Sequence, residues 1–500
     1  MRYSIILAFM FFALGSCSNL EEELRQDLTT DQGAKFSDAA SFLTAAYNGM
    51  RNPYQDQSRF WAAQQHTSDE TVGPTRGGDW DDNGIWRSLH AHSWNAEHDF
   101  LSATFNELLQ VVFLTTNMLQ FNPTAQQAAE ARYLRAFVVL SVADGWGQVP
   151  FREAGSDLLL DAQVLGPQEA VDFVIKEVDA IIKDLPDGAA NKANKNAARV
   201  LKMKALLNKG AYLNRSAPTF NAADMAAVVA LADEITATGK YSLETSFYDN
   251  FAPNNDAISS ENIWTAENIG GVTSGNVRSR WFCTLHYNQN PSGWNGFTTL
   301  GDFYDKFEDG DVRKSSDYPG MTDVSGIKAG FLIGQQFDEK GTALVDRSGN
   351  PLAFTKEVAL KEGGANLEVT GIRAIKYPID YKSGDNVNND FVYYRYSDVL
   401  LMKAEALLRT GNSAGALAIV NQIRSARKAS NLSALDLNSL LDERGRELYW
   451  EGHRRTDLIR FGKYLDATQL KPKSGPERLL FPIPANALAS NPNLKQNPGY

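Results

Sequence analysis

Residues 396–409 have the sequence YSDVLLMKAEALLR, in which the apolar positions return at the spacing of one helix face. Thr410-Gly411-Asn412 then breaks the helical pattern, and residues 414–423 begin a second one. Two helices joined by a short glycine-containing turn form an αα-hairpin, the unit of tetratricopeptide arrays. This part of the chain therefore predicts a helix-pair scaffold.

An earlier segment repeats the pattern. Residues 200–205 (VLKMKA) match residues 399–404 (VLLMKA) at five of six positions, and an alanine-rich helical pattern follows at 222–235. Further helices are expected over residues 38–50, 100–119, 126–142, 168–185 and 437–464. We therefore expect more than one helix pair in the fold.

Two long stretches do not have a helical pattern. Residues 51–99 are rich in Gly, Asp and Trp, and residues 245–392 hold many of the Gly, Asn and aromatic residues, with short strands expected at 353–354 and 371–377. Loops of this length in a compact protein commonly carry function. The expected fold class is mainly α, a tetratricopeptide-like helix-pair scaffold with long irregular loops and a few short strands.

The first residues have the pattern of a bacterial lipoprotein signal. One positive charge at Arg2 precedes the apolar run 5–14, which ends in Leu14-Gly15-Ser16-Cys17. Ten residues are too few to cross a bilayer as a helix, which needs roughly 20, so a signal segment over residues 1–16 is expected and a buried N-terminal helix is the alternative. Cys17 would become the acylated first residue, anchored to a membrane by several chains.

The composition excludes several classes of protein. With 49 Lys+Arg against 60 Asp+Glu the formal net charge is -11, which argues against a nucleic-acid partner. The two cysteines, Cys17 and Cys283, cannot form a disulfide framework or a cysteine metal site. No phosphate loop, nucleophile elbow or zinc-protease motif occurs, and no cofactor is expected. The sequence is that of an ordinary globular protein outside its first residues.

Charged residues over 441–460 alternate in sign at helical spacings. They include Glu443, Arg444, Glu447, Glu451 and Arg454. A catalytic cluster is one interpretation, but we expect a lattice of ion pairs that braces helices. Close by, Pro482-Ile483-Pro484 predicts an extended segment that packs the end of the chain onto the body.

An ordered series of motifs resembles the SusD/RagB family. The motifs are Ser68-Asp69-Glu70, Thr116-Asn117-Met118-Leu119, EARYLRA at 130–136, WGQVPF at 146–151, YRYSDVLLMKAEA at 394–406, Asn421-Gln422-Ile423-Arg424, ERGRELYWEGHRRTDLIR at 443–460, FPIP at 481–484 and NPNLKQNPGY at 491–500. Trp146 stands where the family usually has Phe. The resemblance extends from Cys17 to Tyr500.

The resemblance implies a fold, a location and partners. Members of this family are surface lipoproteins that work with a TonB-dependent outer-membrane transporter of the SusC type. The chain is accordingly expected to consist of a signal segment (1–16), an N-terminal region (17–215) and a C-terminal region (216–500) with a loop-rich insertion at about 245–392. It would capture oligosaccharides, deliver them to the transporter and catalyse no reaction.

Two loops have the residue types that bind sugars, which offer C–H faces to aromatic rings and hydroxyls to polar groups. In the first loop, Trp80 lies among Gly and Asp, and the family's use of its N-terminal loops adds Asp79 and Arg76. Trp86 and Trp94 are expected in the core. The second loop supplies the candidates Trp281, Tyr287, Trp294 and Asn295; Trp281 and Phe282 alternate along a possible strand, so only one of them should face outward.

Other interpretations stay open. His90, His92 and His98 could suggest zinc, but their spacing is poor for one site. Asp79, Asp81 and Asp82 could supply oxygens to calcium, although the EF-hand spacing is absent. A glycosidase needs only two carboxylates that meet in space, and a peptide or glycopeptide ligand is a variant of the binding role.

Overall fold

The computed structural model describes residues 38–500, so the predicted signal segment and Cys17 lie outside the described residues. The longer helices are α2 (Ala39–Gly49), α6 (Asp99–Met118), α7 (Ala125–Trp146), α8 (Pro167–Ile181), α9 (Lys195–Leu213), α10 (Ala222–Ala237), α15 (Tyr396–Arg409), α16 (Ser413–Ala426), α17 (Leu437–Leu448) and α18 (Arg454–Arg460). Short helices are α3 (Arg51–Gln55), α4 (Phe60–Gln65), α5 (Ile85–His90), α11 (Asn255–Ile258), α12 (Ser279–Phe282), α13 (Gly301–Tyr304), α14 (Thr322–Ser325) and α19 (Ala485–Ser490).

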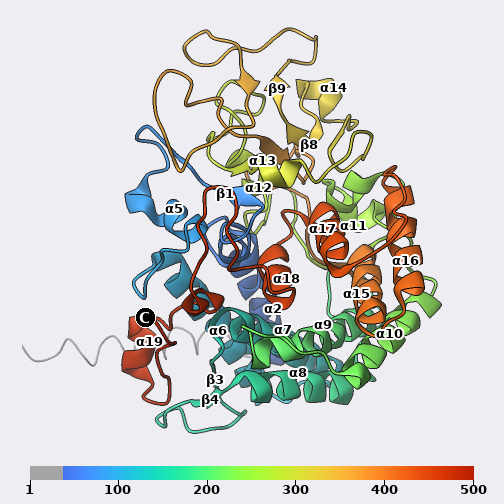
Figure 1. Cartoon of the computed structure of the whole chain (residues 1–500). Coiled ribbons are helices and arrows are strands. Elements are labelled where there is room, and N and C mark those ends of the chain that lie inside the picture. Colours follow the sequence, from blue (N-terminus) through green and yellow to red (C-terminus); the bar gives the residue numbers. More distant parts are fainter. Residues whose placement is uncertain (1–37) are drawn as a thin grey trace, which may run out of the picture.

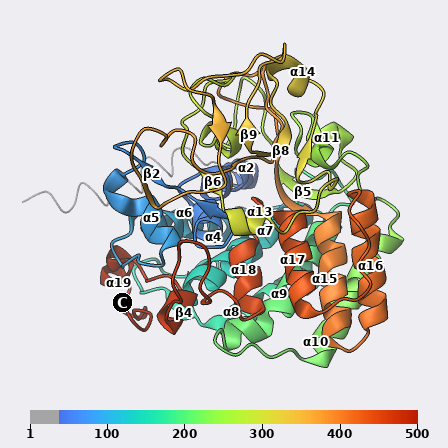
Figure 2. The same cartoon turned by 45° about the horizontal axis from the view of Figure 1, so that its top comes forward.

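The long helices form one array in which each packs against the next. α6 packs on α7, α7 on α8, α8 on α9 and α9 on α10; α10 then packs on α15, and α15 on α16. Figures 1 and 2 show this array curving along the lower and right side of the molecule. The predicted hairpins are thus α9–α10 and α15–α16, joined through α10 and α15. The boundary drawn between residues 215 and 216 lies between the packed helices α9 and α10.

Helix starts follow from the local sequence. Asp38 caps α2 by accepting from the backbone N–H of Ser41, and Thr124 caps α7 by accepting from that of Gln127. α7 is buried on nearly all sides from Ala129 to its end, so it has no polar face. It lies at the centre of the array, and its neighbours bury it.

The expected helix over 437–464 is wrong as one continuous element. α17 ends at Leu448 and α18 begins at Arg454. Between them Trp450 has φ 61° and Gly452 has φ 81°, a left-handed backbone that a helix cannot contain. The break lets Trp450 turn into the core, where it is 0% exposed.

The predicted ion-pair lattice is present, and its partners come from several elements. Glu447 on α17 pairs with Arg313, Arg395 and Arg427 at 3.0, 2.7 and 2.8 Å, and all four side chains are 0–1% exposed. Although burial works in the opposite direction, these arginines hold the pKa of Glu447 well below its usual range. The lattice ties α17 to β13 and to the loops around it.

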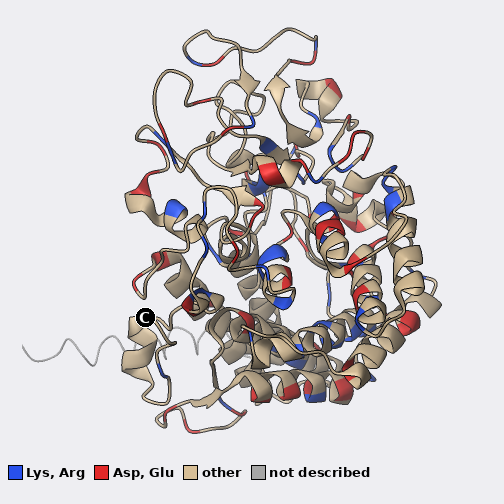
Figure 3. Cartoon of the chain, viewed as in Figure 1, with Lys and Arg blue, Asp and Glu red and all other residues tan. Residues whose placement is uncertain are grey.

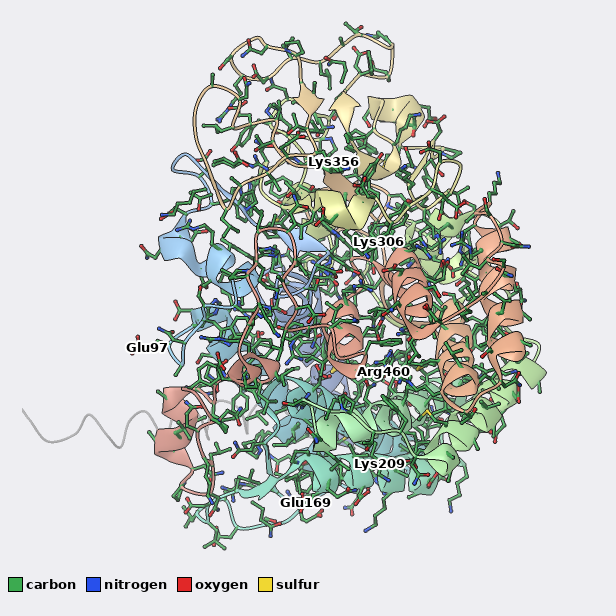
Figure 4. All side chains as sticks on the ribbon, in the orientation of Figure 1. Glu97, Glu169, Lys209, Lys306, Lys356 and Arg460 are labelled. Atoms are coloured by element: carbon green, nitrogen blue, oxygen red, sulfur yellow. The ribbon has the colours of Figure 1, made fainter. Side chains whose placement is uncertain are left out.

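Arg460 also connects helices through buried polar interactions. From α18 it donates to Glu405 of α15 at 2.8 Å and to Asn208 of α9 at 2.8 Å. Figure 4 shows Arg460 inside the molecule, whereas Glu97 and Glu169 lie at its periphery. Buried charge therefore holds the C-terminal helices against the array.

Most of the short strands lie in the loop-rich part, which is opposite the helical layer in Figure 1, whereas the pair β3 (Val149–Phe151) and β4 (Gln163–Leu165) lies beside the lower helices. The strands are β1 (Thr71–Val72), β2 (Thr75–Arg76), β3 (Val149–Phe151), β4 (Gln163–Leu165), β5 (Asn262–Ala266), β6 (Thr298–Thr299), β7 (Ser315–Ser316), β8 (Ala329–Leu332), β9 (Gly334–Gln335), β10 (Ala353–Phe354), β11 (Lys361–Glu362), β12 (Arg373–Ile375) and β13 (Phe391–Arg395). They form two- and three-stranded sheets with the orders β1-β6, β10-β9, β11-β2, β12-β8-β7, β13-β5 and β3-β4. β10 and β12 confirm the two predicted strands.

The surface carries mixed charge. Basic and acidic residues alternate along the lower helices in Figure 3. Among the helices between residues 38 and 500, none is long and apolar enough to span a membrane. The C-terminal segment packs as predicted, because Phe481 donates its backbone N–H to Gly145 and Ile483 is 0% exposed.

Candidate functional site

Two loops meet because a strand pair joins their stems. β1 and β6 are antiparallel, with Thr71 opposite Thr299. The loop 77–84 follows β2 shortly after β1, and the loop 283–297 leads directly into β6. Residues far apart in the sequence are therefore held side by side.

Trp80 and Trp294 are the first contact between these loops. The Trp80 indole Nε1 donates to the Trp294 carbonyl oxygen at 2.9 Å, and the two ring centroids are 6.1 Å apart. The Trp294 side chain is 49% exposed and packs at 4.7 Å on Phe282. Trp80 is half-buried against Trp86 and Phe297. One ring thus stands at the surface, and the other supports it.

The backbone of Trp80 is held in an unusual conformation. Its φ is 60°, in the left-handed region that bulky side chains rarely adopt. Gly296 lies directly against the indole, since a Cβ added there would be 2.3 Å from Trp80 Cε2. Strained backbone of this kind is commonly found at ligand sites.

Tyr287 extends the aromatic surface. Its hydroxyl donates to Asp79 Oδ2 at 2.9 Å, which ties the second loop to the first at another point. Burial, followed by the hydrogen bond and charge of Asp79, raises the pKa of Tyr287 to about 12, so the phenol is neutral. We call Trp80, Tyr287 and Trp294 together the aromatic platform.

Arg347 adds a cation that the sequence did not indicate. Its guanidinium lies 3.9 Å from the centroid of the Tyr287 ring, and its Nε donates to Glu368 Oε1 at 2.6 Å. Its side chain is 50% exposed. Partial burial works against ionisation of Glu368, but hydrogen bonds from Arg347 and His286 outweigh it and lower the pKa of Glu368. Arg347 lies on a hairpin between β9 and β10 without an aromatic neighbour in sequence, so no local pattern marked it.

The chemistry of this surface is stacking beside fixed polar groups. Partly exposed rings offer flat apolar faces, whereas Asp79 and Arg347 offer an acceptor and donors at their edge. Because the rings are already tied to their neighbours, little side-chain entropy is lost on binding. The arrangement suits a ligand with apolar faces and hydroxyl edges.

Two predicted site residues lie beneath the platform. Arg76 is 2% exposed and donates to the Leu367 carbonyl oxygen and the Thr370 hydroxyl, both at 2.6 Å. Burial lowers its pKa to about 10. Asn295 is 0% exposed and donates to the Glu368 carbonyl oxygen at 3.0 Å. Both side chains are buried and bond to the loops beneath the platform.

Trp281 also lies in the core, with 2% of its surface exposed. Residues 279–282 form helix α12 and not the expected strand, and Phe282 is the neighbour that reaches toward Trp294. Only one of the two rings faces outward, as expected. Trp86 and Trp94 are 4% and 2% exposed, which confirms their assignment to the core.

The histidines and aspartates considered for metals point to separate partners. His90, His92 and His98 contact the backbone carbonyl oxygens of Gln469, Thr67 and Ile85. Asp81 pairs with Arg87, and Asp82 accepts from Trp86. Within residues 38–500 no group of three or more His, Cys, Asp or Glu is arranged to hold a metal ion. Cys283 is buried, and burial raises its pKa, so its thiol is unreactive.

Comparisons with known proteins agree on one family. Residues 260–477 match the model of the SusD family. The SusD-like protein P38 of Formosa agariphila is 23% identical, over 97% of this chain and 96% of its own. The starch-binding protein SusD of Bacteroides thetaiotaomicron is 25% identical, over 75% of this chain and 73% of its own.

A solved structure shows the same fold. Surface glycan-binding protein A from Bacteroides thetaiotaomicron, in complex with laminarihexaose, superposes with a TM-score of 0.66 at 16% identity, over 92% of this chain and 98% of its own. The mainly α fold with a helix-pair scaffold is therefore the SusD-like fold.

Proposed function

This chain belongs to the SusD/RagB family, and on that premise we propose that it is a surface glycan-binding lipoprotein. It captures oligosaccharides on the aromatic platform and delivers them to a TonB-dependent outer-membrane transporter of the SusC type. Cys17 is its acylated anchor, and the protein acts by binding alone.

One observation carries the proposal. Trp80, Tyr287 and Trp294 come from two distant loops, yet hydrogen bonds at 2.9 Å join Trp80 to Trp294 and Tyr287 to Asp79. A group of partly exposed aromatic rings held together at a surface is typical of a binding site. The relatives named above include a starch binder and a protein solved with laminarihexaose, which supports a glycan as that partner.

The delivery role rests on the family alone. The neighbouring genes provide the simplest check of this role. A neighbouring gene for a TonB-dependent transporter would support delivery, and neighbouring genes for glycoside hydrolases would indicate the sugar.

The test is retention by a polysaccharide. Starch, laminarin, xylan and pectin are cast into native gels, and the wild-type protein is expected to be slowed by at least one of them. Trp294→Ala removes the most exposed ring of the platform and should weaken the affinity about five- to tenfold by calorimetry with the corresponding oligosaccharide.

Phe113→Ala is the matched control, because Phe113 on α6 is 40% exposed and lies outside both loops. It should leave retention unchanged. If Trp294→Ala binds as tightly as the wild type, the platform is not the site. Sustained release of reducing ends from the retained polysaccharide would favour a glycosidase, and binding of peptides alone would favour a peptide ligand.

A further inference from the structure

A groove of about 480 Å³ lies in the loop-rich part of the molecule. Its walls include Tyr318, Tyr381, Pro253 and Pro319. The volume is within the range of roughly 300–1,000 Å³ typical of small-molecule sites. None of the residues predicted to bind a ligand lines it.

The two tyrosines are fixed by their hydroxyl groups. Tyr318 donates to Asp249 Oδ1 at 2.8 Å, and Tyr381 donates to the Asn290 carbonyl oxygen at 3.0 Å. Both side chains are half-buried. Since the hydroxyls are already bonded, the ring faces are what these residues can offer to a ligand.

The loop that forms one wall is held at both ends. The Asp380 carboxylate accepts from the backbone N–H groups of Lys382 and Asn388, each at 2.9 Å. The Asn388 amide then donates to the Pro253 carbonyl oxygen at 2.6 Å. This wall is therefore pre-organised, which lowers the entropic cost of binding.

Three polar groups of the groove have free hydrogen-bonding capacity. Among the residues that the structure describes, the side chains of Asn254, Lys382 and Ser383 make no hydrogen bond or ion pair, although all three line the groove. The Asp380 carboxylate already accepts two backbone hydrogen bonds within the wall loop, so it is not one of these groups. Aromatic rings beside free amide, hydroxyl and ammonium groups match the faces and hydroxyls of a sugar.

The groove adjoins the platform through two links. Tyr381 bonds to Asn290, which lies on the platform loop 283–297. Asp385, on the wall loop, pairs with Arg278 at 3.1 Å, and Arg278 lies 3.6 Å from the ring centroid of Phe282, the residue beneath Trp294.

We propose that this groove is a second glycan subsite, which binds further sugar units of the same chain whose first units stack on the aromatic platform. The inference rests on the proposed function. It adds that the protein selects longer oligosaccharides over short ones, because only these reach from the platform into the groove.

The experiment compares chain lengths. The polysaccharide that slows the wild type in native gels is partly digested, and trisaccharide and longer fragments are titrated by calorimetry. The wild type should bind the octasaccharide at least about fivefold more tightly than the trisaccharide. Tyr318→Ala and Lys382→Ala should remove this gain and keep the trisaccharide affinity, while Phe113→Ala should change neither.

Each outcome separates the two claims. Equal affinity of the wild type for all lengths overturns the subsite, and so does a gain that survives in both groove variants. Lys382 is exposed, and its side chain has no partner among residues 38–500, so Lys382→Ala can be measured even if Tyr318→Ala does not fold. Trp294→Ala tests the platform itself: if this variant binds all fragments like the wild type, the proposed function fails. If it binds every fragment more weakly while the wild type shows no gain with chain length, the platform stands without the groove. Retention by no polysaccharide contradicts both.

Discussion

At the scale of the residue, the missing side chain of Gly296 leaves room for the Trp80 ring of the platform. A Cβ at this position would lie 2.3 Å from Trp80 Cε2, well inside van der Waals contact. We expect Gly296→Ala to displace the indole and lower glycan affinity by about tenfold, measured by calorimetry.

Gly78 in the first loop is the control, because a Cβ there would meet no atom of residues 38–500 within 4 Å. Gly78→Ala should bind like the wild type. An unchanged affinity for Gly296→Ala, with a cooperative thermal transition, would show that the position of Trp80 does not matter for binding.

The buried carboxyl group of Glu70 makes the free energy of unfolding depend on pH. Burial is the main cause that raises its pKa to about 8, above its ordinary value of 4.5. The folded state therefore holds this proton more tightly than the unfolded chain. Its contribution to stability is complete below about pH 4.5 and is lost as the pH rises through about 8.

Urea unfolding at pH 5, 7 and 9 measures this effect. Glu70→Gln cannot ionise, so the free energy of unfolding of the variant relative to the wild type should rise from pH 5 to pH 9, by up to about 1.4 kcal/mol per pH unit. A difference that stays constant over this range would show that Glu70 is charged at pH 7.

Local composition singled out three rings, and their role in binding stays a prediction. Trp80, Tyr287 and Trp294 lie among Gly, Asp and Asn, and the structure leaves all three rings at least partly exposed. Arg76 and Asn295 have the same neighbours but bond to backbone carbonyls beneath the loops. Only the tertiary fold decides which of these side chains turns inward, so composition could not separate them.

At the scale of the element, helix α17 depends on its buried charges. Glu447→Gln would leave the guanidinium groups of Arg313, Arg395 and Arg427 without their shared carboxylate. We expect a loss of about 3–5 kcal/mol in the free energy of unfolding, measured by urea titration.

Asp442→Asn on the same helix is the comparison. Asp442 pairs with Lys306 at 2.7 Å, but their side chains are 37% and 27% exposed. Such a pair contributes about 0–1 kcal/mol. Similar losses for the two variants would contradict the assignment of α17 as an element held by buried charge.

Periodicity located the long helices but not the strands. α15 has the bounds predicted from its apolar face, because burial on one side leaves a clear pattern. β5 and β13 are buried at every position and pair across a long stretch of sequence, so they have no alternation to detect. The break between α17 and α18 was missed since Trp450 carries no signal for a left-handed backbone.

At the scale of the whole molecule, a helical layer lies opposite a loop-rich part (Figure 1). One core connects residues from α2 to the C-terminal segment. The motifs of the sequence mark this scaffold, whereas the two candidate binding loops were identified by composition. Fold and family were therefore predictable, and the identity of the sugar was not.

A crystal structure with a bound oligosaccharide tests the central claim most directly. The ligand is an octasaccharide from the polysaccharide that retards the protein in native gels. We expect electron density for sugar rings stacked on Trp294 and Trp80, with hydroxyls at Tyr287, Asp79 or Arg347. Density for the oligosaccharide elsewhere on the protein, with none against these rings, would contradict the account.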